Sequence, residues 1–154
     1  MNNADEIIPR LWLGNFASSQ DLNFLRQHHI RVIINCTKNL PFLDCKKIYK
    51  YRVPVDDSLQ IEEIQSMSYW IEKTIPIIAS HYKRGRSILV HCAAGIQRSA
   101  IIVLSFLYQH CHYDPKYALI LMRKKRPYVF LPFMNFILSF RKVYGDEAYG
   151  KLVR

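Results

Sequence analysis

The sequence predicts an α/β fold with a largely parallel central sheet, and three observations lead to this prediction. Short runs of β-branched and aliphatic residues alternate along the chain with longer stretches of helical periodicity. Half of the 154 residues are hydrophobic, which is enough to build a sizeable core. No repeat, low-complexity tract or Gly/Ser linker divides the chain, so residues 1–154 are expected to form one domain.

Strands are predicted in four regions, each rich in β-branched or aliphatic residues. They are residues 7–14, as short strands around a turn, residues 31–35, residues 48–55 with an end near Pro54, and residues 87–90. The last of these bears most directly on function, because Cys92 follows it closely. Binding sites of parallel sheets form at the carboxyl ends of the strands.

Two helices are predicted before that strand. Ser18–His28 is expected to be one helix, with Ser18 as its N-cap and Asp21 three residues later. A long helix is expected from Glu62 to Tyr82, where apolar residues recur at helical spacing. Pro76 falls inside this long helix and should kink or divide it.

Three more helices are predicted after Cys92. Ser99–His110 is apolar on most sides and should be a central buried helix. Asp114 and Pro115 suit the N-cap and the first position of the next helix. A final helix is expected from about Phe133 to Tyr144.

The overall composition limits the classes of partner and compartment. The formal net charge of +10 favours an anionic partner, such as a phosphoprotein, a nucleic acid or an acidic membrane surface, although basic side chains also serve solubility. The four cysteines are interpreted as reduced thiols, since a chain of this size needs no disulfides. The chain has no apolar run long enough to cross a membrane and a polar start. We therefore expect an intracellular protein, cytoplasmic or nuclear, without integral membrane association.

The segment HCAAGIQRS, residues 91–99, carries the strongest chemical signal in the sequence. A loop that leads from a strand into a helix can turn several backbone N–H groups inward, and together with the helix dipole these groups bind a tetrahedral oxyanion. The same positive field favours a thiolate, so the pKa of Cys92 should be depressed. The expected phosphate-binding residues are Ala93, Ala94, Gly95, Ile96, Gln97 and Arg98.

Each remaining residue of this segment has an expected role. Gly95 permits a positive φ in the tight turn. The planar fork of Arg98 can bind two phosphate oxygens. Ser99 can donate a hydrogen bond to the sulfur of Cys92, and His91 is better placed to brace the loop than to act as a base. A free cysteine is most often a small buried hydrophobic residue, but here five residue types and the flanking elements all fit the site.

The segment matches the HCxxGxxRS signature of the dual-specificity protein phosphatases, and the chain resembles the small atypical members of that family. The resemblance implies a compact phosphatase domain with a twisted sheet and helices on both faces, and a reaction that needs no metal or other cofactor. It covers nearly the whole chain, with further similar segments at residues 8–14, 30–37 and 118–127.

The resemblance also implies a general acid on a separate loop, after the strand that reads Val53-Pro54-Val55. The family pattern favours Asp57 over Asp56, and the alternative for Asp57 is a role as a loop residue or an N-cap. In the implied mechanism Cys92 attacks phosphorus, a phosphocysteine forms, and Asp57 first protonates the leaving oxygen and then activates water.

Three further features bear on function. The segment Pro132–Phe136 has other residues at the Asn and Gly positions of the family's Pro-Asn-x-Gly-Phe pattern and lies one residue further from Arg126–Pro127, in a region that should support the acid loop. Cys36 ends a strand near the loop and could form a reversible disulfide with Cys92, or be a buried small residue. The basic run 123–126 suits the last turn of a helix and could also bind an acidic partner.

The expected function is therefore hydrolysis of phosphotyrosine and phosphoserine or phosphothreonine in proteins. An RNA 5′-phosphatase or triphosphatase of the same superfamily is the first alternative, because the positive charge is compatible with RNA. A phosphate-binding module without turnover is the second alternative. The sequence does not reveal the physiological substrate or the oligomeric state.

Overall fold

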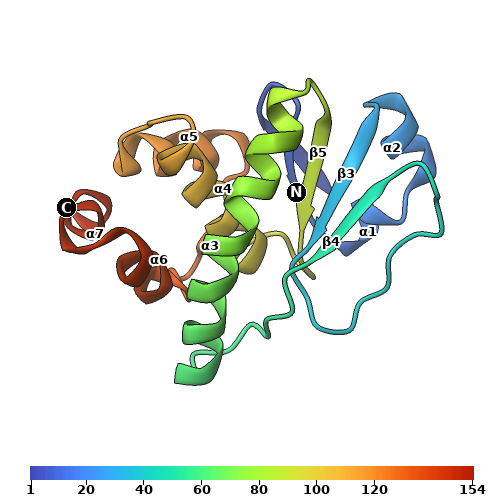
Figure 1. Cartoon of the computed structure of the whole chain (residues 1–154). Helices are drawn as coiled ribbons and strands as arrows, with labels where there is room; N and C mark the ends of the chain where they lie inside the picture. Colours follow the sequence, from blue (N-terminus) through green and yellow to red (C-terminus); the bar gives the residue numbers. More distant parts are fainter.

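A five-stranded sheet forms the centre of the computed structural model, which describes all 154 residues (Figure 1). Its strands are β1 (Ala4–Ile8), β2 (Leu11–Gly14), β3 (Ile30–Asn35), β4 (Tyr49–Arg52) and β5 (Ser87–His91). Their order in the sheet is β1-β2-β5-β3-β4, and only β1 runs antiparallel to its neighbour. This arrangement confirms the predicted α/β class with a mostly parallel sheet.

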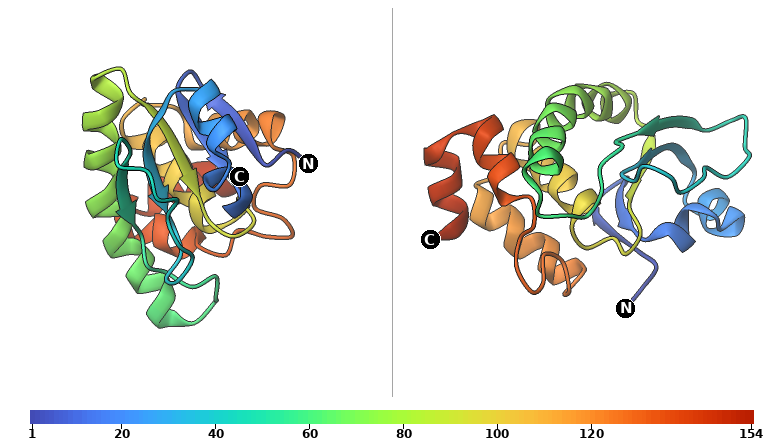
Figure 2. Two further views of the ribbon diagram at one scale, coloured as in Figure 1. Left: turned by 90° about the vertical axis from the view of Figure 1, so that its right-hand side faces the viewer. Right: turned by 90° about the horizontal axis from the view of Figure 1, so that it is seen from below.

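Helices cover both faces of the sheet, as expected (Figures 1 and 2). The short helices α1 (Phe16–Ser19) and α2 (Leu22–Gln27) lie on one face. The other five lie on the opposite face: α3 (Ile61–Lys83), α4 (Arg98–Gln109), α5 (Pro115–Lys125), α6 (Ile137–Tyr144) and α7 (Asp146–Val153). There α5, α6 and α7 form an outer group around α3 and α4.

The central strands are apolar on both sides because each side faces helices. In β3, Val32 and Ile34 belong to the main core, whereas Ile33 packs with Leu25 of α2 in a second, smaller cluster. This explains why the strand reads as a continuous apolar run rather than an alternating one.

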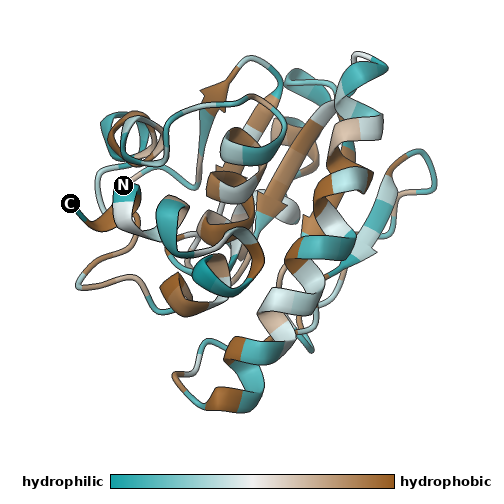
Figure 3. Ribbon diagram, turned by 60° about the vertical axis from the view of Figure 1, so that its left-hand side comes forward, coloured by the Kyte–Doolittle hydropathy of each residue, from teal (hydrophilic) through white to brown (hydrophobic).

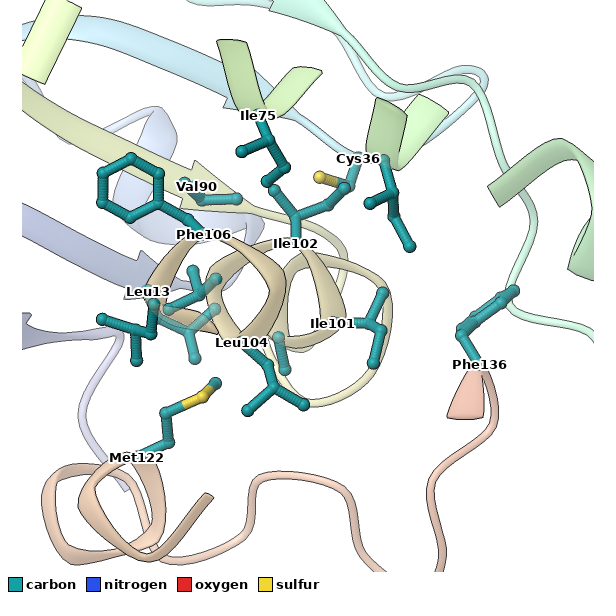
Figure 4. Close-up of a cluster of buried hydrophobic side chains, with 14 of the residues drawn as sticks. Leu13, Cys36, Ile75, Val90, Ile101, Ile102, Leu104, Phe106, Met122 and Phe136 are labelled. Carbon is teal, nitrogen blue, oxygen red and sulfur yellow. The ribbon is translucent and has the colours of Figure 1, made fainter. Parts of the chain in front are cut away.

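Helix α4 lies at the centre of the main core, and residues 99–107 are all buried. Figure 3 shows α4 as largely hydrophobic around its circumference. In Figure 4 its side chains are surrounded by residues from the sheet, α3, α5 and the segment before α6. The helix that follows Cys92 and its loop is therefore fixed from all sides, which confirms the predicted central buried helix.

The single helix predicted over residues 18–28 is wrong, because two short helices occur there. Ser18 lies inside α1, and the side chain of Asn15 caps this helix by accepting a hydrogen bond from the Ser18 N–H (3.0 Å). Asp21 caps α2 by accepting from the Phe24 N–H (3.1 Å). Two Asx side chains thus compete with a continuous helix, as short polar side chains commonly do.

Other boundaries also differ from the prediction. Pro76 does not divide α3, which runs unbroken over 23 residues. The helix expected from Phe133 begins at Ile137 and is not the final one, because α7 follows it and was not predicted. The strand expected over residues 48–55 is confined to β4. None of the helices combines the length and apolar character needed to span a bilayer.

Candidate active site

The register of the sheet aligns the carboxyl ends of four strands at one edge, where the candidate site lies. His91 at the end of β5 pairs with Gly14 of β2 and with Asn35 of β3. Asn35 in turn pairs with Arg52 at the end of β4. Cys92 comes immediately after this row, as the sequence predicted, and residues 92–97 form the loop that leads into α4.

Every carbonyl between Ala93 and Ile96 accepts a hydrogen bond from a group outside the loop. The donors are the Phe16 N–H to Ala93 (3.1 Å), the Arg126 guanidinium to Ala94 (3.0 Å) and Gly95 (2.8 Å), and the Phe130 N–H to Ile96 (3.0 Å). The amides of Ala93, Ala94, Ile96 and Gln97 donate to no acceptor within the chain. A loop whose carbonyls are taken up on the outside presents its free amides to an anion.

Gly95 is required by the backbone of this loop. Its φ is +70°, a conformation that L side chains rarely adopt. A Cβ at this position would also lie 2.4 Å from the carbonyl oxygen of Gly14, so any side chain would collide with β2. The Gly95 N–H donates to the sulfur of Cys92 (3.3 Å).

The Cys92 thiol is buried, with 2% of its surface exposed. Burial disfavours a thiolate, but hydrogen bonds from Ser99, the charge of Arg98 and the Gly95 amide outweigh it and lower the pKa of Cys92. The Ser99 hydroxyl lies 3.1 Å from the sulfur. The structure therefore places Ser99 where the sequence predicted, against the sulfur of Cys92.

Arg98 begins α4 and joins the loop to the segment after β4. Its Nη1 donates to the carbonyl of Val55 (3.0 Å). Its Nε is buried and has no hydrogen-bond partner within the chain. A buried guanidinium N–H without an acceptor is costly unless a ligand supplies one, so this group is arranged for an anion.

His91 has no exposed surface, and its Nδ1 lies 3.1 Å from the Cys92 carbonyl. The pKa of His91 is lowered to about 4, mainly by burial. The hydrogen bond to the Cys92 carbonyl raises this pKa, whereas the charges of Arg52 and Arg98 lower it further. The ring is consequently neutral at physiological pH and donates Nδ1–H to the carbonyl. This geometry agrees with the bracing role expected for His91.

Arg126 is the main residue of the site whose position the sequence did not reveal. It was interpreted as part of a basic run in a helix's last turn, yet it has no exposed surface. Besides the two loop carbonyls, its guanidinium contacts Asp5 (2.8 Å) and the Asn2 carbonyl (2.7 Å). It therefore fixes the loop after Cys92, whereas within the basic run Lys124 and Lys125 are exposed and Arg123 is partly exposed.

The two candidate acids occupy different surroundings. Asp56 forms an ion pair with Lys38 (3.2 Å), which also pairs with Glu63. Asp57 instead accepts a hydrogen bond from the side-chain amide of Asn135 (2.7 Å). The segment that departs from the family pattern thus contacts Asp57 through a residue that the sequence interpretation had not assigned a role.

Cys36 lies at the end of β3, buried beside the loop as expected, and its N–H donates to the His91 carbonyl (2.7 Å). Burial and the neighbouring Cys92 raise the pKa of Cys36, partly offset by Arg98. All four cysteines are free thiols. The position suits the proposed redox pairing, which stays a prediction.

Known proteins resemble this chain in sequence and in structure. Human dual specificity protein phosphatase 9 is 30% identical over 141 residues, which cover 89% of this chain and 36% of that protein. Mouse dual specificity protein phosphatase 2 is 36% identical over 105 residues, or 68% and 31% of the two chains. The crystal structure of human DUSP28 superposes with a TM-score of 0.82 at 20% identity and covers 93% of each chain.

The chain thus spans about a third of the curated relatives that it matches. The family model of the dual specificity phosphatase catalytic domain matches residues 11–145, which include every element from β2 to α6 and the whole catalytic loop. The chain belongs to the dual specificity phosphatase family.

Proposed function

We propose that this protein is a cysteine-dependent phosphatase that hydrolyses phosphotyrosine and phosphoserine or phosphothreonine in proteins. The observation that carries the proposal is a buried sulfur with a lowered pKa that lies beside free loop amides and the unpaired Nε of Arg98. A nucleophile and a tetrahedral-anion site are thereby combined in one loop.

In the first step the Cys92 thiolate attacks phosphorus, and an S–P bond forms while the P–O bond to the substrate breaks. Arg98 and the amides of residues 93–97 bind the three phosphoryl oxygens, where charge is held in the transition state. Asp57 donates a proton to the leaving oxygen, so the substrate departs as an alcohol or phenol.

In the second step water attacks the phosphocysteine and inorganic phosphate is released. Asp57, now a carboxylate, accepts a proton from that water. The Ser99 hydroxyl, 3.1 Å from the sulfur, stabilises the departing thiolate. The enzyme returns to its starting state, because the proton lost by Asp57 in the first step is regained in the second.

The short length of the acid loop favours an open pocket, which would accept both kinds of phosphorylated side chain. Only residues 53–60 connect β4 to α3, so no insertion deepens the rim on this side. A deep pocket would reach phosphotyrosine alone, whereas a shallow one also admits the shorter serine and threonine side chains. The requirement for a reduced Cys92 supports action in a reducing compartment, the cytoplasm or the nucleus.

The experiment that tests this function compares the wild type with Cys92→Ser on three substrates: a phosphotyrosine peptide, a phosphothreonine peptide and triphosphorylated RNA. We expect the wild type to release phosphate from both peptides and the variant to release none. Turnover of the RNA alone would replace the proposal by the RNA-phosphatase alternative. Binding of phosphate without any turnover would show a phosphate-binding module.

A further inference from the structure

The segment between α5 and α6 is bonded directly to the catalytic loop through one side chain. The amide of Gln97, only 6% exposed, donates to the carbonyls of Phe133 (2.7 Å) and Leu131 (3.3 Å). Its oxygen accepts from the Asn135 N–H (3.0 Å). A single buried glutamine thus uses both donors and its acceptor to fix this segment against the loop.

The same segment is bonded to the acid loop through the side chain of Asn135. Its Nδ2 donates to Oδ1 of Asp57 (2.7 Å), across 78 positions of sequence. The acid loop is also attached at Val55, which accepts from Arg98 (3.0 Å). Both attachments lead back to adjacent residues, Gln97 at the end of the catalytic loop and Arg98 at the start of α4.

We propose that Asn135, fixed by Gln97, is a positioning residue that orients Asp57 for proton transfer to the leaving oxygen. This inference rests on the proposed function, in which Asp57 is the general acid. A protonated carboxyl has one oxygen that carries the proton and one that can only accept. Because Asn135 donates to Oδ1, the transferable proton is carried by Oδ2.

The chemistry of the donor suits a group that alternates between acid and base. The neutral amide of Asn135 can donate to Asp57 both before and after the proton leaves. Asp56 has a different kind of partner: it forms an ion pair with Lys38 (3.2 Å), which also pairs with Glu63 of α3 and so attaches the loop to that helix. This contrast assigns the acid role to Asp57 and the loop-supporting role to Asp56.

The test uses aryl phosphates whose leaving groups differ in basicity. Phenyl phosphate needs its leaving oxygen protonated, whereas 2,4-dinitrophenyl phosphate leaves as a stable anion and does not. For Asn135→Ala we expect kcat/KM on phenyl phosphate, which reports formation of the phosphocysteine, to fall roughly ten- to a hundredfold, since misplacement of a catalytic group costs about that much. On 2,4-dinitrophenyl phosphate kcat/KM should be nearly unchanged.

A second variant tests the same contact in case Asn135→Ala fails to fold. Asn135→Leu keeps the approximate size and the backbone N–H that contacts Gln97 but removes the side-chain donor without adding a charge beside Asp57, and it should show the same selective loss. Tyr128→Ala is the matched control, because this side chain lies in the same segment, is 54% exposed and makes no hydrogen bond. We expect it to leave both substrates unaffected.

The outcomes separate this inference from the proposed function. Asp57→Asn should reproduce the selective loss more strongly, which shows that Asp57 is the acid. An equal loss on both substrates in the Asn135 variants, or no loss on either, would overturn the positioning role while Asp57→Asn still identifies the acid. A wild type that hydrolyses neither aryl phosphate would instead contradict the proposed function itself.

Discussion

At the scale of single residues, the site depends on opposing effects at Cys92. Burial alone would raise the pKa of its thiol, and a merely buried cysteine such as Cys36 shows that result. At Cys92 the hydrogen bonds from Ser99, the charge of Arg98 and the Gly95 amide reverse the direction. The groups around the sulfur therefore distinguish the thiol of Cys92 from that of a buried core residue.

The pH dependence of alkylation tests this reversal. Iodoacetamide reacts with the thiolate, so the inactivation rate rises with pH through the pKa of Cys92. Because that pKa is lowered, the midpoint should lie below that of an ordinary cysteine thiol. Ser99→Ala removes the largest stabilising contact and should move the midpoint to higher pH. A midpoint that Ser99→Ala leaves unchanged would contradict this account of the sulfur.

Arg126 offers a test of stability at the same scale. Arg126→Leu should lower the free energy of unfolding by roughly 3–5 kcal/mol, because it leaves Asp5 and two loop carbonyls without their donor. Urea denaturation measures this change. The exposed neighbour is the control, since Lys125→Leu should change stability by no more than about 0.5 kcal/mol. Equal effects of the two substitutions would exclude a bracing role for Arg126.

Oxidation tests the predicted pairing of Cys36 with Cys92. Under mild peroxide the thiolate of Cys92 should form a sulfenic acid, which then condenses with the Cys36 thiol to give a disulfide and water. Non-reducing peptide mapping should identify this linkage, and Cys36→Ser should instead accumulate irreversibly oxidised Cys92. Cys45→Ser is the control. The absence of a Cys36–Cys92 peptide would leave Cys36 as a buried core residue.

At the scale of elements, tertiary packing overrides local preferences. Pro76 removes one backbone hydrogen bond from α3, yet the helix continues, because residues on both sides of it are buried against the core. The opposite occurs over residues 16–27, where Asn15 and Asp21 cap separate short helices. A continuous helical pattern in the sequence therefore does not by itself predict whether the helix is continuous.

Removal of the proline should increase stability. Pro76 is exposed, so Pro76→Ala loses no core contact and restores the missing N–H. We expect the free energy of unfolding to rise by roughly 2 kcal/mol, after the added entropy of the unfolded chain is taken into account. Ser80→Ala, also exposed in α3, should add only about 0.5 kcal/mol. A decrease on Pro76→Ala would show that the proline fits the helix better than this argument allows.

At the scale of the whole molecule, the features that depend on neighbouring residues in the sequence could be predicted. The strand, the loop and the helix around Cys92 are contiguous, so periodicity and residue types were sufficient to place Gly95, Arg98 and Ser99. The parallel sheet followed from the alternation of strands and helices, and it accounts for the site's location at the carboxyl ends of the strands.

Contacts between distant segments could not be predicted in this way. Arg126 contacts the loop across 31 positions, and Asn135 contacts Asp57 across 78. In sequence the first is one of four consecutive basic residues and the second a substituted motif position. Nothing local distinguishes a fully buried arginine from its exposed neighbours, so only the folded structure reveals these supports.

The central claim is that Cys92 carries the phosphoryl group during turnover. Rapid acid quench of the wild type with a ³²P-labelled phosphotyrosine peptide, followed by peptide mapping, tests it most directly. We predict radioactivity on the peptide that contains Cys92, as an acid-stable phosphocysteine, and none in Cys92→Ser. Release of phosphate without a labelled enzyme, or a label on another residue, would contradict the account.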